Sequence, residues 1–242
     1  KVFNRLKNFL NIWQLKHDKR VNEAFKTAKL LISSIPDSYR AIKRYKGLES
    51  VIIPETGCFL SEDIPTERFE EEYLHVMWVG KFDFRKQLPL ALWTIATVAN
   101  PHVILDVYGS GSDEQMHHAK YLASELGIED MVVWHGNQSN DVVLEAMRKS
   151  QLFIFTSVSE DTSTVVLEAI SNRLPVVCFD ACGMAAVIDN KVGRKISLSK
   201  PMQSVHDFAK VLKNLERNRD LLKQMSENCR QRQMELSWEV KA

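Results

Sequence analysis

The chain has 242 residues, of which 45% are hydrophobic and 26% are charged, and its formal net charge is +1. This length and apolar content are ample for a sizeable core in one large domain, or in one domain and part of another. The nearly neutral charge gives no electrostatic argument for binding nucleic acid or an anionic membrane surface. No apolar stretch approaches the roughly 20 residues of a membrane-spanning helix, and we find no signal peptide.

The four cysteines, Cys58, Cys178, Cys182 and Cys229, are scattered along the chain. Cys178 and Cys182 lack the second pair or the histidines of a zinc site, so we expect thiols rather than metal ligands. This usage fits a reducing compartment, and we expect a cytoplasmic location, with or without peripheral attachment at the inner face of the membrane. Because the first residue is Lys1, we expect the chain to belong to a longer gene product or to be a trimmed form of one.

The first 60 residues predict a small segment of alternating helices and strands. Apolar residues at steps of three and four predict a helix over residues 1–26. Two short strands, 29–34 and 50–54, flank a predicted helix that ends at Gly47. A polar, proline-containing stretch follows, and we place a linker at 61–73 and a second domain at 74–242.

From residue 74 onward, strands and helices alternate at a regular spacing. This alternation predicts an α/β fold with a Rossmann-like parallel sheet of about six strands covered by helices on both faces. The predicted strands are 74–79, 103–108, 131–134, 152–155, 175–179 and 193–197. The predicted helices are 87–99, 113–126, 141–149, 165–170, 182–189, 203–216 and 220–238.

The stretch 152–170 predicts a buried strand, a polar loop and the start of a helix. The carboxyl end of a parallel strand that leads into a helix is where α/β folds bind ligands. Unpaired N–H groups and the helix dipole favour an anion there, typically a phosphate. The residues around the predicted helix start are Asp161, Thr162, Ser163, Thr164 and Val165.

Two carboxylates, Glu160 and Glu168, bracket this turn. Each has a purely structural interpretation, because Glu160 could complement the helix dipole and Glu168 could be an exposed helix residue. Glu168, however, has apolar neighbours in sequence, and an ionised carboxylate in such a setting is costly without a partner. Since helical side chains lean toward the N-terminus of their helix, Glu168 could reach a hydroxyl of a ligand whose phosphates lie at that helix start.

A second loop carries clustered positive charge. Lys81, Arg85 and Lys86 follow the strand 74–79 and the turn residue Gly80. Clustered ammonium and guanidinium groups at the carboxyl end of a sheet suit a diphosphate, although a solvated basic turn is an equally good interpretation.

Gly109 and Gly111 form half of a dinucleotide-binding fingerprint, but the third position is Glu114. A tight strand-to-helix turn is therefore favoured over an NAD site. His135, after the third strand of this series, could touch a ligand, although a lone histidine in such a place is more often structural.

Several motifs together resemble the retaining GT-B glycosyltransferases, specifically glycosyltransferase family 4. They span about residues 74–240, the donor-binding domain of that family. The motifs are Glu160 and Glu168 with seven residues between them, Leu167-Glu168-Ala169, Leu174-Pro175-Val176-Val177, Cys182-Gly183-Met184, Val79-Gly80-Lys81 with Lys86, and Val107-Tyr108-Gly109-Ser110-Gly111.

The resemblance implies transfer of a sugar from a nucleotide diphosphate sugar, expected to be UDP-linked, to a glycan or glycolipid acceptor with retention at the anomeric centre. Glu160 would bind the donor sugar and Glu168 the ribose. Lys81 and Lys86 would bind the diphosphate and stabilise the leaving group, so that neither a metal nor a cofactor is required. The other expected donor-binding residues are Gly80, Arg85, Gly109, Gly111, His135, Gly136, Asn137, Asp161, Thr162, Ser163, Thr164 and Val165.

The chain departs from the family in two motifs and in length. Lys81 stands where the family usually has Arg, and Asp161-Thr162-Ser163 replaces the commoner Gly-Phe-Gly. Residues 1–60 resemble only the last part of the N-terminal acceptor domain. We therefore expect the remainder of that domain as a partner in the same protein, and we expect the chain alone to bind nucleotide sugar but to transfer it poorly. The alternatives are a non-catalytic nucleotide-binding module and, on the strength of Gly109-Ser110-Gly111, an NAD-dependent oxidoreductase.

Overall fold

The computed structural model describes residues 2–53, 56–58, 64, 67–160 and 163–241, with side chains from residue 9 to residue 240 within these ranges. The chain forms two compact units, Lys1–Glu55 and Thr56–Ala242. Most of the first half of the predicted linker lies outside the described residues. Its later part contains a 3-10 helix, η1 (Glu67–Glu70), in which Arg68 and Phe69 are buried.

The first unit contains helices α1 (Val2–His17), α2 (Lys19–Thr27) and α3 (Pro36–Lys46) and strands β1 (Ile32–Ser33) and β2 (Val51–Ile52). The two strands pair in parallel and are shorter than predicted. The prediction of a single helix over residues 1–26 is wrong, because the helix is interrupted at Asp18. The Asp18 carboxylate accepts hydrogen bonds from the backbone N–H groups of Arg20 and Val21, at 2.8 and 3.3 Å, and so begins a new helix.

The second unit confirms the predicted α/β fold. Its six strands are all parallel, in the order β5-β4-β3-β6-β7-β8. The strands are β3 (Leu74–Val79), β4 (Val103–Tyr108), β5 (Val132–Gly136), β6 (Leu152–Phe155), β7 (Val176–Phe179) and β8 (Gly193–Ile196). The helical elements are α4 (Leu88–Val98), α5 (Asp113–Glu125), η2 (Glu129–Met131), α6 (Asn140–Lys149), α7 (Thr164–Ser171), α8 (Met184–Val187), α9 (Pro201–Arg217), α10 (Arg219–Glu235) and α11 (Trp238–Lys241).

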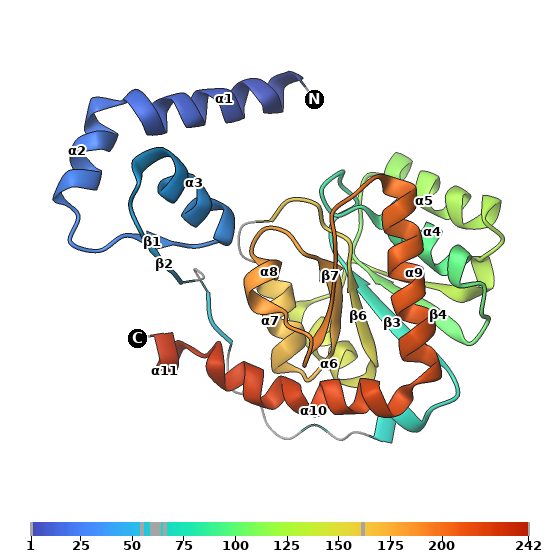
Figure 1. Cartoon of the computed structure of the whole chain (residues 1–242). Helices are drawn as coiled ribbons and strands as arrows, with labels where there is room; N and C mark the ends of the chain where they lie inside the picture. Colours follow the sequence, from blue (N-terminus) through green and yellow to red (C-terminus); the bar gives the residue numbers. More distant parts are fainter. Residues whose placement is uncertain (1, 54–55, 59–63, 65–66, 161–162, 242) are drawn as a thin grey trace. The chain divides into compact units, whose positions relative to one another are not determined.

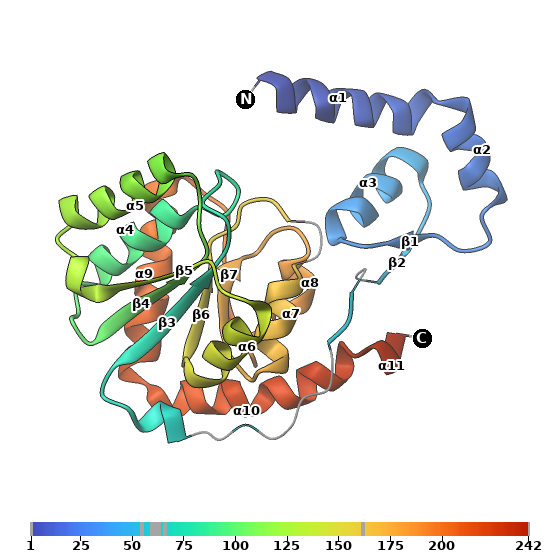
Figure 2. The same ribbon diagram turned by 180° about the vertical axis from the view of Figure 1, so that it is seen from behind.

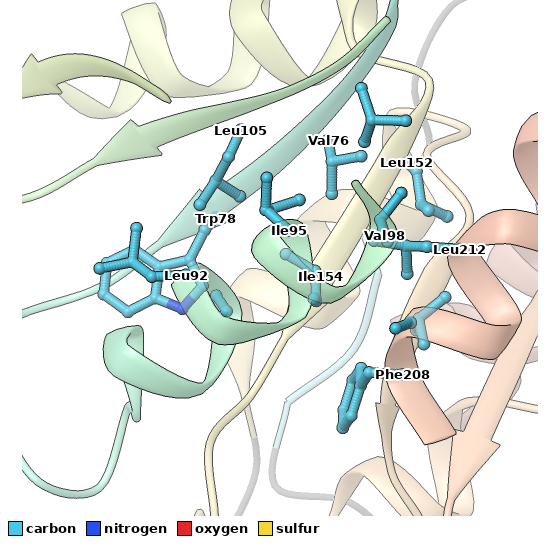
Figure 3. Packing of buried hydrophobic residues seen from close by; sticks show 14 of the residues in the cluster. Val76, Trp78, Leu92, Ile95, Val98, Leu105, Leu152, Ile154, Phe208 and Leu212 are labelled. Carbon is cyan, nitrogen blue, oxygen red and sulfur yellow. The ribbon is translucent and has the colours of Figure 1, made fainter. Parts of the chain in front are cut away.

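Helices cover both faces of this sheet (Figures 1 and 2). On one face, α4, α5 and α9 enclose a core in which Trp78, Ile154 and Phe208 are at most 1% exposed (Figure 3). On the other face, α6, α7 and α8 pack against strand residues that include Met77 and Phe153. Alternate strand residues therefore pack into two separate cores, one on each face of the sheet. This explains why the strand sequences are continuously apolar. α10 packs against α7, α9 and η1.

The strand order determines where a ligand can bind. The chain adds strands outward from β3 to β5, then returns and continues from β6 on the opposite side of β3. A crevice forms at such a switch point, outside the carboxyl ends of the two central strands. The loops that border it follow β3 and β6, and they are the two loops in which the sequence predicts charged ligand-binding residues.

Candidate functional site

A cavity of about 450 Å³ lies at the carboxyl ends of β3, β4 and β5. Besides three glycines, its walls include Lys81, Tyr108, Ser110, Asn137, Gln138 and Val143. The backbones of the three loops are joined directly. The Gly80 N–H donates to the Tyr108 carbonyl at 3.0 Å, and the Gly109 N–H donates to the Gly136 carbonyl at 2.7 Å. The cavity is therefore built from loops that support one another.

The glycines of these loops allow close backbone packing. Gly109 has φ +133°, and a Cβ atom at this position would lie 1.9 Å from the carbonyl oxygen of Gly80. A Cβ atom on Gly111 would lie 2.8 Å from Cβ of Phe82. Both glycines are thus required by the turn itself, as the tight-turn interpretation expects.

Lys86 and Glu160 meet at the switch point. Lys86 Nζ lies 2.8 Å from Glu160 Oε1, and the two side chains are only 17% and 14% exposed. The buried hydroxyl of Ser157 lies 2.9 Å from the same carboxylate oxygen. Two opposite charges that are largely removed from water stabilise each other, and they place an ammonium group and a carboxylate side by side in the crevice. The sequence prediction did not include Ser157.

The loops that carry this pair are tied together by the strand end of β6. Thr156 Oγ1 donates to the carbonyl of Lys86 at 2.7 Å and accepts from Trp78 Nε1 at 3.0 Å. The N–H of Val158 donates to the carbonyl of Arg85 at 2.9 Å. Thr156 is fully buried. The position of Lys86 is therefore set by the core, and not by a mobile surface loop.

Asp83 shapes the loop before Lys86. Its carboxylate accepts hydrogen bonds from the backbone N–H groups of Arg85 and Lys86, at 2.8 and 3.1 Å. Burial raises the pKa of Asp83, but these bonds and the Arg85 guanidinium outweigh burial and hold the pKa below its usual value. Arg85 is exposed, forms an ion pair with Asp83 at 3.1 Å and does not line the cavity.

Two of the three predicted cations face the site. Lys81 is exposed and lines the cavity. The stem of Lys86 packs against Gly80, because a Cβ atom on Gly80 would lie 3.2 Å from Lys86 Cγ. The cavity and the Lys86–Glu160 pair are thus adjacent.

The start of α7 offers an unsatisfied hydroxyl. Ser163 is the N-cap residue of α7, is 6% exposed, and its Oγ has no hydrogen-bond partner among the described residues. Thr164 is exposed and Val165 is half-buried, while Asp161 and Thr162 lie outside the described residues. A buried donor without a partner beside the free N–H groups of a helix start fits an anionic ligand.

Glu168 is half-buried on α7. Burial raises the pKa of its carboxyl group, and a hydrogen bond with the side chain of Asn140 opposes this shift. Asn140 is the first residue of α6, the helix whose Val143 lines the cavity. The carboxyl of Glu168 therefore faces the helix that borders the cavity. Asn140 was not predicted, although its place at a helix start after a strand was a usable signal.

His135 does not line the cavity. Its ring stacks on the ring of Tyr108, which does, with centroids 4.1 Å apart and planes inclined by 5°. His135 Nε2 lies 2.7 Å from Asp106 Oδ1, and His75 Nδ1 lies 2.7 Å from Asp106 Oδ2. Asp106 and His75 were not predicted. His135 and Gly136 end β5, one and two residues beyond the predicted end of the strand, and Asn137, in the loop that follows, lines the cavity.

Cys178, Cys182 and Cys229 are free thiols, as predicted. Within the described part of the chain, no group of three or more His, Cys, Asp or Glu side chains could hold a metal ion. Among the same residues, no helix is both long enough and apolar enough to cross a membrane.

Comparison with known proteins defines the class first. The fold is that of the Rossmann-like domain of GT-B glycosyltransferases. A mutant of S. aureus TarM in complex with UDP, fondaparinux and alpha-GlcNAc-glycerol superposes with a TM-score of 0.71, with 18% identity over 92% of this chain and 44% of TarM. HepE of Anabaena in complex with UDP and glucose gives a TM-score of 0.71 and 17% identity, over 91% of this chain and 62% of HepE. WaaG, a glycosyltransferase involved in lipopolysaccharide biosynthesis, gives 0.68 and 22%, over 95% of this chain and 68% of WaaG.

The sequence then gives the family. Residues 61–232 match the family described as glycosyl transferases group 1, and this chain belongs to that family. An uncharacterized glycosyltransferase of Haemophilus influenzae is 25% identical over 209 residues, which is 86% of this chain and 51% of the relative. The chain thus spans about half the length of the curated relative that it matches.

Proposed function

We propose that this chain is the donor-binding part of a retaining glycosyltransferase of family 4, and that its donor is a nucleotide diphosphate sugar, with UDP as the nucleotide. The observation that carries the proposal is the Lys86–Glu160 pair at the switch point, next to a cavity lined by Lys81. Membership of the glycosyl transferases group 1 family supports the reaction type. The UDP bound in the TarM and HepE structures makes UDP the first nucleotide to test.

In this proposal, the diphosphate lies between Lys81, Lys86 and the start of α7. Breaking the bond between the anomeric carbon and the diphosphate oxygen increases the negative charge on the leaving group. Two ammonium groups and the N–H groups of a helix start, fixed in advance, stabilise that charge as it develops. The unsatisfied hydroxyl of Ser163 supplies a further donor. These groups are the reason why we propose a reaction that needs no metal.

The two carboxylates take different parts of the donor. We assign Glu160 to hydroxyl groups of the sugar, because it is held beside Lys86 at the phosphate end. We assign Glu168 to the ribose, because it faces α6 at the side of the cavity. Asn137 and Gln138 would border the base. Arg85 has the weakest support, since it is paired with Asp83 and lies outside the cavity lining.

The acceptor belongs to the same proposal, as a glycan or glycolipid bound with the help of further residues of an N-terminal domain. We expect this chain alone to bind the donor and to transfer sugar poorly, and the cytoplasmic location also stays a prediction. A turnover number for this chain equal to that of a longer form of the protein would overturn the expected need for those residues.

Calorimetry tests the donor site directly. UDP, GDP and NAD are titrated into the chain without divalent metal, and we expect UDP to bind. Lys86→Ala and Glu168→Ala should each weaken UDP binding by about tenfold or more, since each removes a charged group that contacts the ligand. Lys210→Ala, at an exposed position of α9, is the matched control and should leave affinity unchanged. If Lys86→Ala and Glu168→Ala both bind UDP as the wild type does, the assignment of the site is wrong.

A further inference from the structure

A buried carboxylate, that of Asp106, lies on the strand that ends in Tyr108, a residue lining the cavity. Asp106, on strand β4 between β5 and β3, is 7% exposed. Each of its oxygen atoms lies 2.7 Å from one imidazole nitrogen, Oδ1 from His135 Nε2 and Oδ2 from His75 Nδ1. Burying a charged carboxylate costs free energy, and here both of its oxygens are hydrogen-bonded to histidines. We therefore ask what function this arrangement serves.

The carboxylate determines the tautomer of His135. An ionised carboxylate can only accept hydrogen bonds, so the nitrogen that faces it must carry the proton. In neutral His135 this leaves the proton on Nε2 and makes Nδ1 an acceptor. Carboxylates that orient an imidazole in this way are common behind metal and catalytic sites, where they fix the direction of the ring.

The position of His135 bears on the loop that lines the cavity. Its ring lies flat against Tyr108, a lining residue. Its carbonyl accepts a hydrogen bond from the side chain of Gln138 at 2.7 Å, and Gln138 also lines the cavity. The next residue, Gly136, adopts φ +69° and accepts from the N–H of Gly109 at 2.7 Å. Rotation of the imidazole would remove its stacking on Tyr108. The backbone of the same residue carries the bond to Gln138 and directly precedes the joint with Gly109.

We propose that Asp106 is a positioning residue for nucleotide binding: it holds the His135 imidazole against Tyr108 and thereby fixes the 135–138 loop in its ligand-ready shape. This inference rests on the proposed function, because it assumes that the cavity takes the nucleotide. Asp106 itself touches no ligand. It acts through His135, which makes the loop rigid before binding and lowers the entropy lost when the nucleotide binds.

His75 provides a matched control. It occupies the other oxygen of Asp106 but lies on β3. Together with Asp106 and Tyr108 it lines a second cavity of about 580 Å³, which does not include residues 135–138. Its side chain bonds Asp106 and its backbone bonds Gln151, and neither bond involves residues 135–138. Replacing His75 perturbs the same buried carboxylate without releasing His135.

The test compares Asp106→Asn, His135→Phe and His75→Gln with the wild type. Phe at position 135 keeps a ring to stack on Tyr108 but removes the Nε2–H donor. Three quantities are measured: the affinity for UDP by calorimetry, hydrogen exchange of the backbone amides of residues 136–138, and the tautomer of His135 from its imidazole nitrogen shifts. Melting temperature and circular dichroism show which variants are folded.

We expect Asp106→Asn and His135→Phe to weaken UDP binding by about five- to tenfold, a change of the size that an ordinary hydrogen bond contributes. Exchange at residues 136–138 should become faster in both variants, and the His135 tautomer should become mixed in Asp106→Asn. His75→Gln should change affinity less than about twofold, as expected for a change that leaves the loop in place. If Asp106→Asn does not fold, the His135→Phe variant alone decides.

Two failures can be told apart. If wild-type protein binds no nucleotide, the proposed function fails, whatever the exchange rates are. If wild-type protein binds UDP and Asp106→Asn and His135→Phe bind it equally well with unchanged exchange at residues 136–138, the positioning inference is overturned and the proposed function stands. Equal loss of affinity in His75→Gln and Asp106→Asn would also overturn it, because it would indicate general damage to the fold.

Discussion

The two compact units of this chain differ in how far their apolar side chains are buried. In the unit Thr56–Ala242, residues such as Leu92 and Ile95 are fully buried between a helix and a sheet. In the unit Lys1–Glu55, Phe9 is 64% exposed and Leu30 is 62% exposed, and neither α2 nor α3 has a buried residue. Both units show helix periodicity and capping residues in their sequences. The contrast teaches that periodicity selects an element, whereas stability requires a second layer to cover its apolar face.

The largest expected effect comes from separating the units. A polypeptide of residues 1–55 should not fold in isolation, because about 50 residues with so little buried apolar surface cannot offset the loss of chain entropy. A polypeptide of residues 56–242 should keep its fold and its UDP affinity. Circular dichroism and the dispersion of amide NMR signals measure both outcomes. Cooperative thermal unfolding of the 1–55 polypeptide would contradict this prediction, because it would show that the first unit is stable on its own.

Matched truncations of leucine sharpen the same contrast. Leu92→Ala in α4, where the side chain is fully buried, should lower the free energy of unfolding by about 2–5 kcal/mol, since it removes buried methyl groups and leaves a cavity. Leu10→Ala in α1, where the side chain is 49% exposed, should change it by no more than about 0.5 kcal/mol. Urea denaturation of the whole chain, followed by tryptophan fluorescence, to which the buried Trp78 contributes, gives both values. Similar losses for the two variants would mean that α1 is covered as fully as α4.

The parallel sheet could be predicted because its signals are local. Apolar runs such as Leu152-Phe153-Ile154-Phe155 are followed by turn and capping residues, and their regular alternation with helices leaves few possible topologies. The break at Asp18 also had a local signal, since aspartate is a favoured N-cap residue. The apolar period continues through it, and the prediction followed the period.

The contacts within the site could not be derived in this way. Lys86 and Glu160 lie 74 positions apart, and Asp106 reaches histidines 31 and 29 positions away on the two neighbouring strands. These contacts depend on strand order and register, which no local pattern specifies. The resemblance to a family assigned Lys86 and Glu160 to one donor site but did not predict their ion pair. Nothing in the sequence indicated the second arrangement, because a polar residue within a strand has no assigned neighbour until the sheet is known.

Within the unit Thr56–Ala242, the half-buried Glu168 contrasts with the apolar core, because we expect it to lower stability while it contributes to ligand binding. Burial raises the pKa of Glu168 above its ordinary value of 4.5. At pH values between this ordinary pKa and the folded pKa, the carboxyl group is therefore protonated in the folded state and ionised in the unfolded state. The wild type therefore loses stability as the pH rises from this ordinary value through the folded pKa. Glu168→Gln should be more stable than the wild type at about pH 7 and equal to it at about pH 3, while its UDP affinity falls about tenfold. Denaturation at both pH values measures the change in unfolding free energy, and calorimetry measures the change in UDP affinity. A variant less stable than the wild type at neutral pH would contradict the sign of this argument.

The smallest expected effect concerns His75. Its hydrogen bond to Asp106 raises the pKa of His75 above the ordinary value of 6.5, although partial burial opposes the shift. A raised pKa means that the folded state binds a proton more tightly than the unfolded state does, so this stabilisation is complete below the ordinary value and disappears as the pH rises through the folded pKa. Glu71, Asp141, Glu145 and Lys149 border the same cavity, and they are unchanged in a single substitution. The difference in unfolding free energy between wild type and His75→Gln should therefore be larger at about pH 5.5 than at about pH 9, with the sign favouring the wild type. Asp106→Asn should reduce the same pH dependence, because it removes the carboxylate that contributes most to the raised pKa and leaves the weaker contribution of Glu71. A difference that does not vary with pH would show that His75 is held by packing rather than by the carboxylate.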